Sequence, residues 1–369
     1  MTTTKLAVPY TAFKQEASVI KEELSAAFDN VLESGRYIMG PELATFEREF
    51  GEICQTKFAL GVDNGTSALF LVLRSLGLKN TDEVITAPNS FLASASSIAL
   101  AGARPAFADV GRDGNIDPAR LEDAIGPRTK AVMPVHLTGR PARMPEILEI
   151  AKRHNLFVLE DAAQAVGASL NGRPVGSWGD AASFSLHPLK NLHALGDGGM
   201  IATSSQDLYN DILKARNHGL RDRETSDFWS YNCRLDELQA AFLRVQARYL
   251  EEWTQARREK AFRYNELLRP YVEVPEEGQG ERCVYQTYVI RAERRDALVQ
   301  YLRDNGVEAL VHYRILIPLQ PAARELGYSA NDFPEAARQA ERIISLPIYS
   351  SLTEEQQDYV AELIRSFYA

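Results

Sequence analysis

The hydrophobic and polar positions of this chain switch repeatedly between two periods. Short apolar runs at 57–63 (KFALGVD), 83–87 (EVITA) and 131–137 (AVMPVHL) are predicted to be buried strands. Segments between them, such as 67–77 and 144–155, repeat apolar residues at helical spacing. This alternation predicts a mainly parallel sheet with helices on both faces and functional loops at the carboxyl ends of its strands.

Further elements are predicted on both sides of this block. Two helices precede it, over 16–35 and 41–54. After it, 234–268 is predicted to be one very long helix or two joined helices that link two domains. The remainder has the pattern of a small α+β unit with its own short sheet. The sequence therefore predicts a large domain over 1–265 and a small C-terminal domain over 266–369.

Composition and charge narrow the classes of function. A chain of 369 residues with 45% hydrophobic content can bury a sizeable core, and its formal charge of -9 provides no general basic field for nucleic acid. No segment has the pattern of a signal peptide or a membrane span. The three cysteines fit neither a disulfide framework nor a zinc site. Nucleic acid, membrane and metal are therefore not expected as partners, and the cytoplasm is the expected location.

Three predicted strand ends carry residues suited to chemistry. At the first, Gly65, Thr66 and Ser67 form a strand-to-helix turn that favours a phosphate, although turn and capping chemistry explains the same residues. At the second, Asp161 ends a buried strand, where a carboxylate either needs a cationic partner or caps a helix. At the third, a proline interrupts the strand, so that Lys190 projects from the strand end.

A phosphate cradle, a buried acid and a lysine at one sheet edge are the groups that pyridoxal 5'-phosphate (PLP) requires. Its aldehyde bonds to a lysine amine, its phosphate suits a helix N-terminus, and a carboxylate holds the proton on its ring nitrogen. A nucleotide-binding α/β protein is the alternative, but the chain has neither a GxGxxG nor a GxxxxGK loop. Glu160 and Asp180 are interpreted as capping residues.

Several motifs, in a fixed order, match a known family over nearly the whole chain. They are SGRYIMGPELATFEREF, NGTSAL, EDAAQAVGA, SFSLHPLKNLHALGDGG, YNCRLDELQAA and VHYRILIPLQP. In these motifs the chain resembles the DegT/DnrJ/EryC1/StrS family of sugar aminotransferases. The resemblance implies the type I fold of PLP-dependent transferases, with a large α/β domain around a mainly parallel, seven-stranded sheet and a small α+β C-terminal domain.

The resemblance also implies roles for individual residues. Lys190 would attach the cofactor covalently and act as the base, Asp161 would pair with the ring nitrogen, and Gln164 would bond the ring hydroxyl. Phe91 is the candidate for stacking on the ring, the alternative being an ordinary core residue. The residues implied to hold the phosphate are Gly65, Thr66, Ser67, Ser185 and, from the partner subunit of a homodimer with shared sites, Asn232. The candidates for substrate contacts are Arg36, His187, Arg234, His312 and Tyr313.

The implied reaction is a transamination. The enzyme would take an amino group from L-glutamate, hold it as pyridoxamine 5'-phosphate (PMP) and pass it to a keto-sugar, expected to be nucleotide-linked, in amino-sugar biosynthesis. Similar proteins with histidine at the lysine position dehydrate a sugar, so Lys190 favours transamination. The alternatives are a PLP-dependent sugar dehydratase and a non-catalytic PLP-binding regulator. Leu186 replaces the aromatic residue usual in its motif, which leaves the particular sugar open.

Overall fold

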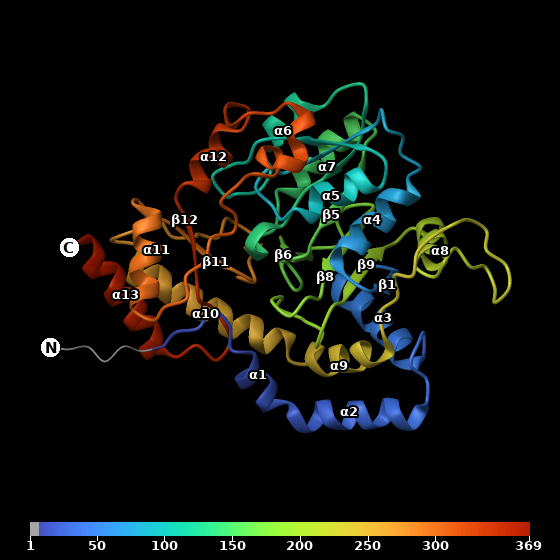
Figure 1. Cartoon of the computed structure of the whole chain (residues 1–369), viewed down its shortest axis with the longest axis horizontal. Helices are drawn as coiled ribbons and strands as arrows, with labels where there is room; N and C mark the ends of the chain where they lie inside the picture. Colours follow the sequence, from blue (N-terminus) through green and yellow to red (C-terminus); the bar gives the residue numbers. More distant parts are fainter. Residues whose placement is uncertain (1–6) are drawn as a thin grey trace.

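A computed structural model describes residues 7–369 of the chain (Figure 1). The central sheet consists of β1 (Phe58–Val62), β2 (Glu83–Thr86), β3 (Arg104–Phe107), β4 (Thr129–Met133), β5 (Phe157–Asp161), β8 (Ala181–Ser185) and β9 (Gly199–Thr203). Its strand order is β1-β9-β8-β5-β4-β2-β3, and within it β9 alone runs antiparallel to its neighbours. The mainly parallel, seven-stranded sheet expected from the sequence is confirmed.

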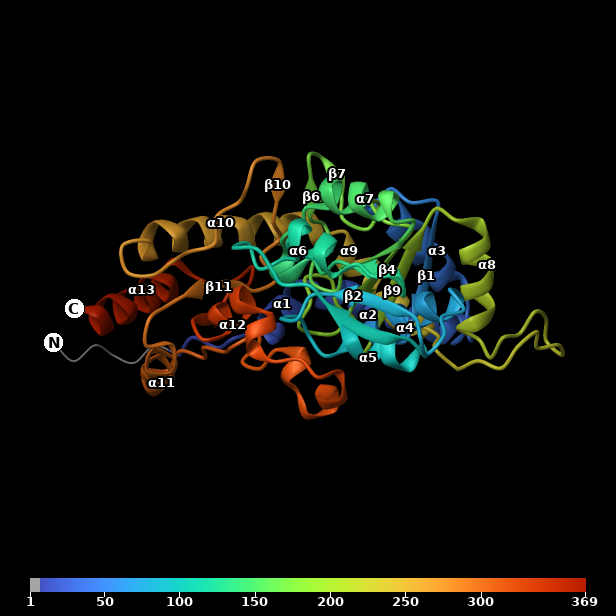
Figure 2. The same cartoon turned by 90° about the horizontal axis from the view of Figure 1, so that it is seen from above.

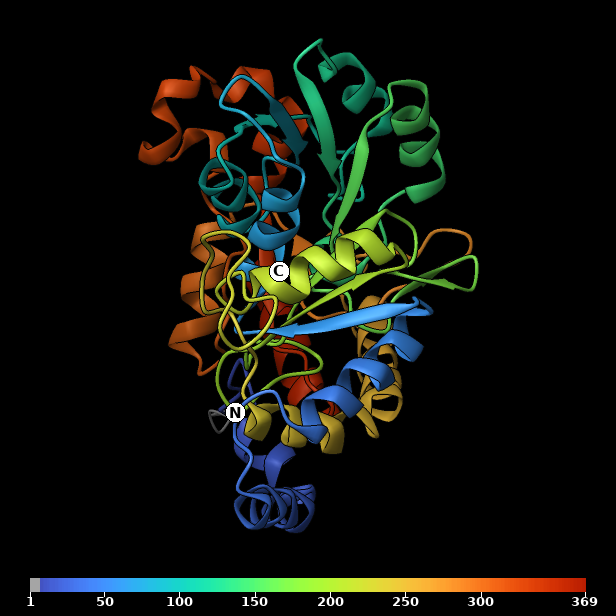
Figure 3. The ribbon, with the colours of Figure 1, turned by 90° about the vertical axis from the view of Figure 1, so that its right-hand side faces the viewer.

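Helices cover both faces of this sheet. They are α3 (Pro41–Cys54), α4 (Gly65–Ser75), α5 (Ala93–Leu100), α6 (Pro118–Ala124), α7 (Met144–Arg153), α8 (Gln206–Ala215) and α9 (Glu237–Ala247). Along β9, Met200 and Ala202 pack with α3 and α9, whereas Ile201 packs with α4 and α8. Figure 3 shows α3 and α8 on opposite sides of β1. Successive strand residues therefore enter different cores, as a two-residue period requires.

Two helices, not one, form the N-terminal stretch. The pattern over 16–35 predicts a single helix, but the structure has α1 (Phe13–Val19) and α2 (Lys21–Ser34), separated by Ile20. Ile20 leaves helical geometry (φ -111°, ψ 16°) and packs with Leu24 against Phe242 and Val245 of α9. Burial of this side chain is the physical reason for the break. Helix α2 consequently lies alongside α9 (Figure 1).

A second core lies at the other end of the molecule. α10 (Leu250–Leu268) follows α9, so the predicted long stretch is two joined helices. Figure 2 shows α10 extending from α9 to the part of the molecule that contains this second core. There β11 (Tyr288–Arg291) pairs antiparallel with β12 (Ile343–Leu346), beside α11 (Arg295–Asp304) and α13 (Glu354–Tyr368). Val8 joins this core, although it comes from the start of the chain.

Shorter elements join the two parts. β10 (Glu281–Arg282) pairs with β6 (Ser169–Leu170), which pairs with β7 (Arg173–Pro174). α12 (Pro334–Ala340) packs on the core of the central sheet through Ala336, and the short turns η1 (Leu137–Gly139), η2 (Ile317–Leu319), η3 (Pro321–Leu326) and η4 (Ala330–Asp332) complete the elements. The division at residue 265 stays a prediction, and residues 1–6 of the predicted large domain lie outside the described residues.

Across residues 7–369, no helix is both long and apolar enough to cross a lipid bilayer.

Candidate active site

The residues predicted at the ends of β5 and β8 meet at the carboxyl edge of the sheet. The two strands are parallel neighbours, and Asp161 lies opposite Ser183 in their ladder. Lys190 follows β8 in a turn in which its backbone N–H donates to the His187 carbonyl (2.8 Å). Burial lowers the pKa of the Lys190 ammonium to about 8, against the attraction of the Asp161 carboxylate. The structure thus brings the predicted lysine and acid together in surroundings that favour a neutral amine.

Asp161 is only 4% exposed, and each of its carboxylate oxygens accepts one hydrogen bond. Oδ2 accepts from the Ser94 hydroxyl (2.7 Å) and Oδ1 from the Ala163 amide (3.2 Å). Burial raises the pKa of Asp161, while these two bonds and the Lys190 charge act in the opposite direction. Turns, not a helix, follow Asp161, so the helix-capping alternative does not apply. A lone pair remains on each oxygen for a protonated ring nitrogen.

The start of α4 lies against the end of β8. Asn64 caps the helix, because its side chain accepts from the Ser67 amide (2.8 Å) and its carbonyl from the Ala68 amide (3.1 Å). The amides of Gly65 and Thr66 are the remaining donors of the first turn, as a bound anion requires. A Cβ on Gly65 would lie 2.7 Å from Cβ of Ser185, so only glycine permits this approach. Capping by Asn64 therefore leaves two amides of this turn open for an anion.

Ser67 differs from the other predicted phosphate contacts. Its side chain hydrogen-bonds to the Asp63 carboxylate, whose pKa is raised by burial. The hydroxyl of Ser67 consequently already has a partner within the protein. The backbone amides at the start of α4 and the side chains of Thr66 and Ser185 remain as the groups best placed for an anion.

The side-chain amide of Gln164 is held in one orientation. Its Oε1 accepts from the Thr138 amide (2.6 Å), which leaves the Nε2 donors directed away from that contact. Thr138 lies in η1 with φ 61°, and a Cβ on the next residue, Gly139, would lie 2.7 Å from Cγ2 of Val284. This tight turn fixes the amide so that it presents a donor, which is what a ring hydroxyl or its anion would require.

Aromatic residues border the Lys190–Asp161 pair. Phe91 is 54% exposed, so the alternative of an ordinary core residue does not apply, and its ring centroid lies 5.8 Å from that of Tyr313. His312 Nδ1 hydrogen-bonds to Ser345 Oγ (2.8 Å), and burial, with the Lys190 charge, lowers its pKa. Burial raises the pKa of Tyr313 to about 12, and the Asp161 charge acts in the same direction. These charge effects place His312 and Tyr313 near the pair.

The other predicted substrate residues, and the predicted phosphate contact Asn232, occupy different positions. His187 is exposed beside Lys190 and accepts from the Leu189 amide (3.2 Å) at Nδ1. Arg234 is half-buried and donates to the Asn217 side chain (3.0 Å). Asn232 is exposed and forms a backbone bridge with the same Asn217. Exposed Arg36, between α2 and α3, has no hydrogen bond to the Lys190–Asp161 pair in the described part of the chain.

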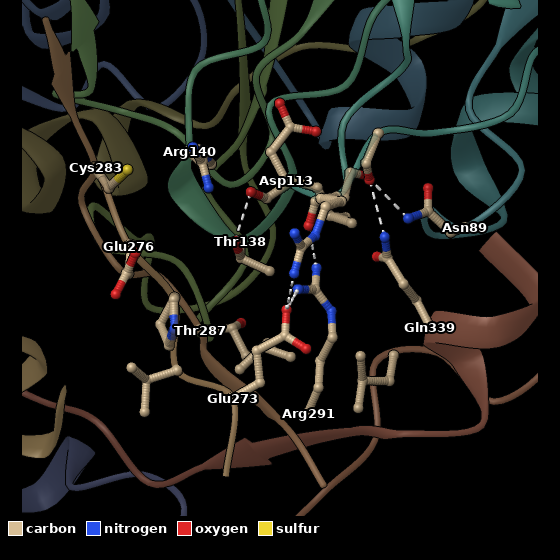
Figure 4. A pocket seen from close by; sticks show the side chains of 18 of the residues that line it. Asn89, Asp113, Thr138, Arg140, Glu273, Glu276, Cys283, Thr287, Arg291 and Gln339 are labelled. Atoms are coloured by element: carbon tan, nitrogen blue, oxygen red, sulfur yellow. Dashed lines mark hydrogen bonds and ion pairs between the residues drawn. The ribbon is translucent and has the colours of Figure 1, made fainter. Parts of the chain in front are cut away.

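A cavity of about 800 Å³ opens beside these residues, a size typical of small-molecule sites. Thr138, His312 and Tyr313 line it together with charged groups from the segment after α10. Figure 4 shows Glu273 and Arg291, an ion pair at 2.7 Å, side by side near the middle of the view, with Asn89 to their right. Another of its arginines, Arg140, pairs with Glu281 at 2.8 Å. Two of the predicted substrate residues, His312 and Tyr313, therefore line a large cavity with polar walls.

Two buried polar groups next to Asp161 are absent from the sequence-based site. Ser94 is 1% exposed and Glu160 is 0% exposed. Glu160 is not a helix cap: its oxygens accept from the amides of the 176–179 loop at 2.8–2.9 Å and contact His136 Nε2 at 3.0 Å. The sequence does contain a sign of each residue. Glu160 is an acid inside an apolar strand, and Ser94 lies one helical turn after Ser90.

The fold and these residues define the structural class of the protein. A lysine and a buried acid at adjacent parallel strand ends, beside a helix N-terminus with open amides, are the arrangement of the type I fold of PLP-dependent transferases, the fold of the solved relatives. The sequence profile of the DegT/DnrJ/EryC1/StrS aminotransferase family matches residues 18–365, and the chain belongs to that family.

Comparison with curated relatives covers almost the whole chain. The chain is 42% identical to the "pleiotropic regulatory protein" of Geobacillus stearothermophilus, with 98% of each chain covered. It is 38% identical to the dTDP-3-amino-3,4,6-trideoxy-alpha-D-glucose transaminase of Streptomyces venezuelae, with 98% of this chain and 96% of that protein covered.

Solved structures give the same result. S. venezuelae DesV superimposes with a TM-score of 0.95 at 37% identity, covering 98% of both chains. Bacillus subtilis NtdA with bound cofactor PMP superimposes with a TM-score of 0.91 at 29% identity, covering 99% of this chain and 86% of that one.

Proposed function

We propose that this protein is a PLP-dependent aminotransferase that passes an amino group to a keto-sugar carried on a nucleotide, in amino-sugar biosynthesis. The observation that carries the proposal is the position of half-buried Lys190 near buried Asp161 at one edge of the sheet, where each charge acts on the pKa of the other. The transaminase from Streptomyces supports the reaction and the class of acceptor. The structure with bound PMP supports the cofactor.

The residues at this edge fit PLP at each of its polar groups. The open amides of Gly65 and Thr66, with the side chains of Thr66 and Ser185, would hold the phosphate, whereas the amide and hydroxyl of Ser67 already have partners within the protein. Gln164 would donate to the ring hydroxyl, and Phe91 would stack on the ring. PLP, when bound, supplies an aldehyde that bonds to amines and a ring that accepts electrons. Asp161 would hold the proton at the ring nitrogen, where its charge keeps the ring an effective acceptor.

Lys190 would serve first as the point of attachment and then as the base. Both tasks need a neutral amine, and a pKa of about 8 leaves much of it neutral near that pH. Once free of that attachment, Lys190 Nζ would take a proton from the α-carbon of the donor and hold it for transfer. L-Glutamate is the proposed donor, and the candidates for substrate contacts remain Arg36, His187, Arg234, His312 and Tyr313.

We further propose that the protein acts as a homodimer with shared sites. Asn232, the residue implied to reach the phosphate of the partner subunit, is exposed and pairs with Asn217 of its own subunit. Next to it, Trp229 is 95% and Tyr231 56% exposed, which is unusual for large aromatic side chains and typical of a contact surface. The cytoplasm is the proposed location, since the three cysteines are free and buried.

A half-reaction tests the proposal. Protein loaded with PLP should convert L-glutamate to 2-oxoglutarate in an amount equal to the subunits present, while the cofactor spectrum changes to that of PMP. Adding nucleotide-linked keto-sugars should then restore the PLP spectrum with the true acceptor. Lys190→Ala is the control and should give neither change.

A second candidate is a non-catalytic PLP-binding regulator, which the name of the Geobacillus relative favours. A dehydratase, the other alternative, would not form 2-oxoglutarate. Failure of the half-reaction with glutamate and every other amino donor tried, in protein that binds PLP, would contradict the aminotransferase and support the regulator.

A further inference from the structure

Two buried hydroxyls lead to the carboxylate of Asp161. Ser90 Oγ donates to Ser94 Oγ at 2.7 Å, and Ser94 Oγ donates to Asp161 Oδ2 at 2.7 Å. Ser90 and Ser94 are 3% and 1% exposed, so bulk water does not compete for these bonds. Ser94 belongs to α5, whereas Asp161 ends β5, so the contact joins a helix to the catalytic edge of the sheet.

The charge on Asp161 fixes the direction of these bonds. An ionised carboxylate only accepts, so the single Ser94 proton must point to Oδ2, and Ser90 must then donate to Ser94. A proton on Oδ2 would let Asp161 donate to Ser94 instead, so neither bond would have a fixed direction. The chain of two hydroxyls is therefore arranged to stabilise the charged form, since hydrogen bonds to a charged group are stronger than those between neutral groups.

We propose that Ser94 is a positioning residue for the reaction: its hydroxyl holds Asp161 ionised and aimed at the ring nitrogen of PLP, and Ser90 orients that hydroxyl. The inference rests on the proposed PLP function. Ser94 acts through Asp161 and does not itself reach the cofactor in this scheme.

Other charged or titratable groups act on Asp161 without replacing this contact. Lys190 and His136 favour its charged form through space, and Asp161 in turn raises the pKa of Tyr313. Among side chains, the Ser94 hydrogen bond is the largest of the effects that lower the pKa of Asp161. Removing it should therefore leave burial, which raises that pKa, less opposed.

Ser94→Ala and Ser97→Ala form a matched pair for the test. Ser97 is also on α5 and is 0% exposed, but its hydroxyl donates to the Ser94 carbonyl (3.2 Å) and not to Asp161. Each variant would be loaded with PLP labelled with ¹⁵N in the ring, and the ring-nitrogen signal would be followed against pH. Turnover and the thermal midpoint of the apoprotein would be measured in parallel.

In S94A the ring nitrogen should lose its proton at a lower pH than in the wild type, and kcat should fall by about tenfold or more with little change in KM for the donor. Ser94→Thr keeps a hydroxyl at this position, so its ring-nitrogen titration and its kcat should both lie close to those of the wild type. S97A should keep the wild-type titration even if it unfolds earlier. If S94A does not fold, Ser90→Ala carries the test with a smaller shift in the same direction.

Identical titrations for S94A and S97A, in a protein whose wild type binds PLP, would overturn this inference and leave the proposed function standing. If S94A and S97A lost equal stability and had the same cofactor spectrum, this inference would be overturned in the same way. A wild-type protein that binds no PLP would overturn the proposed function, and the role of Ser94 with it.

Discussion

Lys190 acquires its chemistry from where the chain buries it. An exposed lysine is almost fully protonated at neutral pH, whereas burial brings the pKa of this one to about 8. The sequence motif identifies the residue, but only the surrounding structure gives this shift, because the residues that exclude water come from distant segments.

The rate at which apoprotein attaches PLP should follow this pKa. Below it the ammonium has no lone pair to attack the aldehyde, so the rate should rise with pH, pass its midpoint at about pH 8 and level off above. Absorbance after mixing with PLP measures it, with N-acetyl-lysine as the control. A rate that keeps rising up to pH 10.5, the ordinary pKa of a lysine, would contradict the buried amine.

Asp161→Asn should remove the charge that holds the ring proton while keeping the size of the side chain. We expect kcat to fall about 100- to 1000-fold, as for other preorganised electrostatic contacts, with PLP still attached. Steady-state kinetics and the spectrum of the bound cofactor check this.

Asp109→Asn is the matched control for that substitution. Asp109 is also buried, at 7% exposure, but it accepts from the amides of Glu335 and Ala336 at the start of α12. The Asp109→Asn variant should be less stable than the wild type but should keep the wild-type spectrum of the bound cofactor. Equal turnover in the Asp161 and Asp109 variants would contradict the role of Asp161.

The roles of some residues could not be predicted from the sequence, because their hydrogen-bond partners lie in distant segments of the chain. Ser94 and Glu160 look like a helix serine and a capping acid until α5 and the 176–179 loop are seen to meet β5. Lys190 and Asp161 could be predicted because strand ends locate them without knowledge of their partners.

At the scale of elements, the junction of α4 with β8 depends on the lack of a side chain at Gly65. Gly65→Ala would place a methyl group 2.7 Å from Cβ of Ser185 and push the helix start from the strand end. The dissociation constant for PLP should rise about tenfold or more, since overpacking typically costs 1–3 kcal/mol. Fluorescence titration of apoprotein with PLP measures it.

Gly126→Ala is the control for this element, because a Cβ there meets nothing within 4 Å. It should bind PLP as the wild type does. Unchanged affinity in the Gly65 variant would show that the close approach of α4 to β8 has no part in cofactor binding.

Periodicity predicts most of these elements but not their breaks. The apolar period over 16–35 continues through Ile20, whereas in the structure Ile20 leaves helical geometry where it packs against α9. The strands of the sheet were predictable because nearly all their residues are buried, whichever partner they have.

At the scale of the whole molecule, the order of the motifs indicates the family and therefore the architecture. It does not indicate that Val8 pairs with Val307 or that α12 packs on the large core, because such contacts join segments far apart in the sequence.

Hybrid dimers test whether sites are shared. If the site containing Lys190 of one subunit uses Asn232 of the other, a hybrid of Lys190→Ala with Asn232→Ala contains one intact site. Co-expression should then restore about a quarter of wild-type activity, since half of randomly paired dimers are hybrids with one of two sites intact. Activity no higher than the mean of the two separate variants would contradict sharing.

The proposed function depends on one covalent bond, between PLP and Lys190. The most direct measurement is to incubate the protein with PLP, reduce it with borohydride and locate the retained cofactor by peptide mass spectrometry. We expect a single modified peptide, with the pyridoxyl group on Lys190. A label on a different lysine, or none at all, would contradict the account.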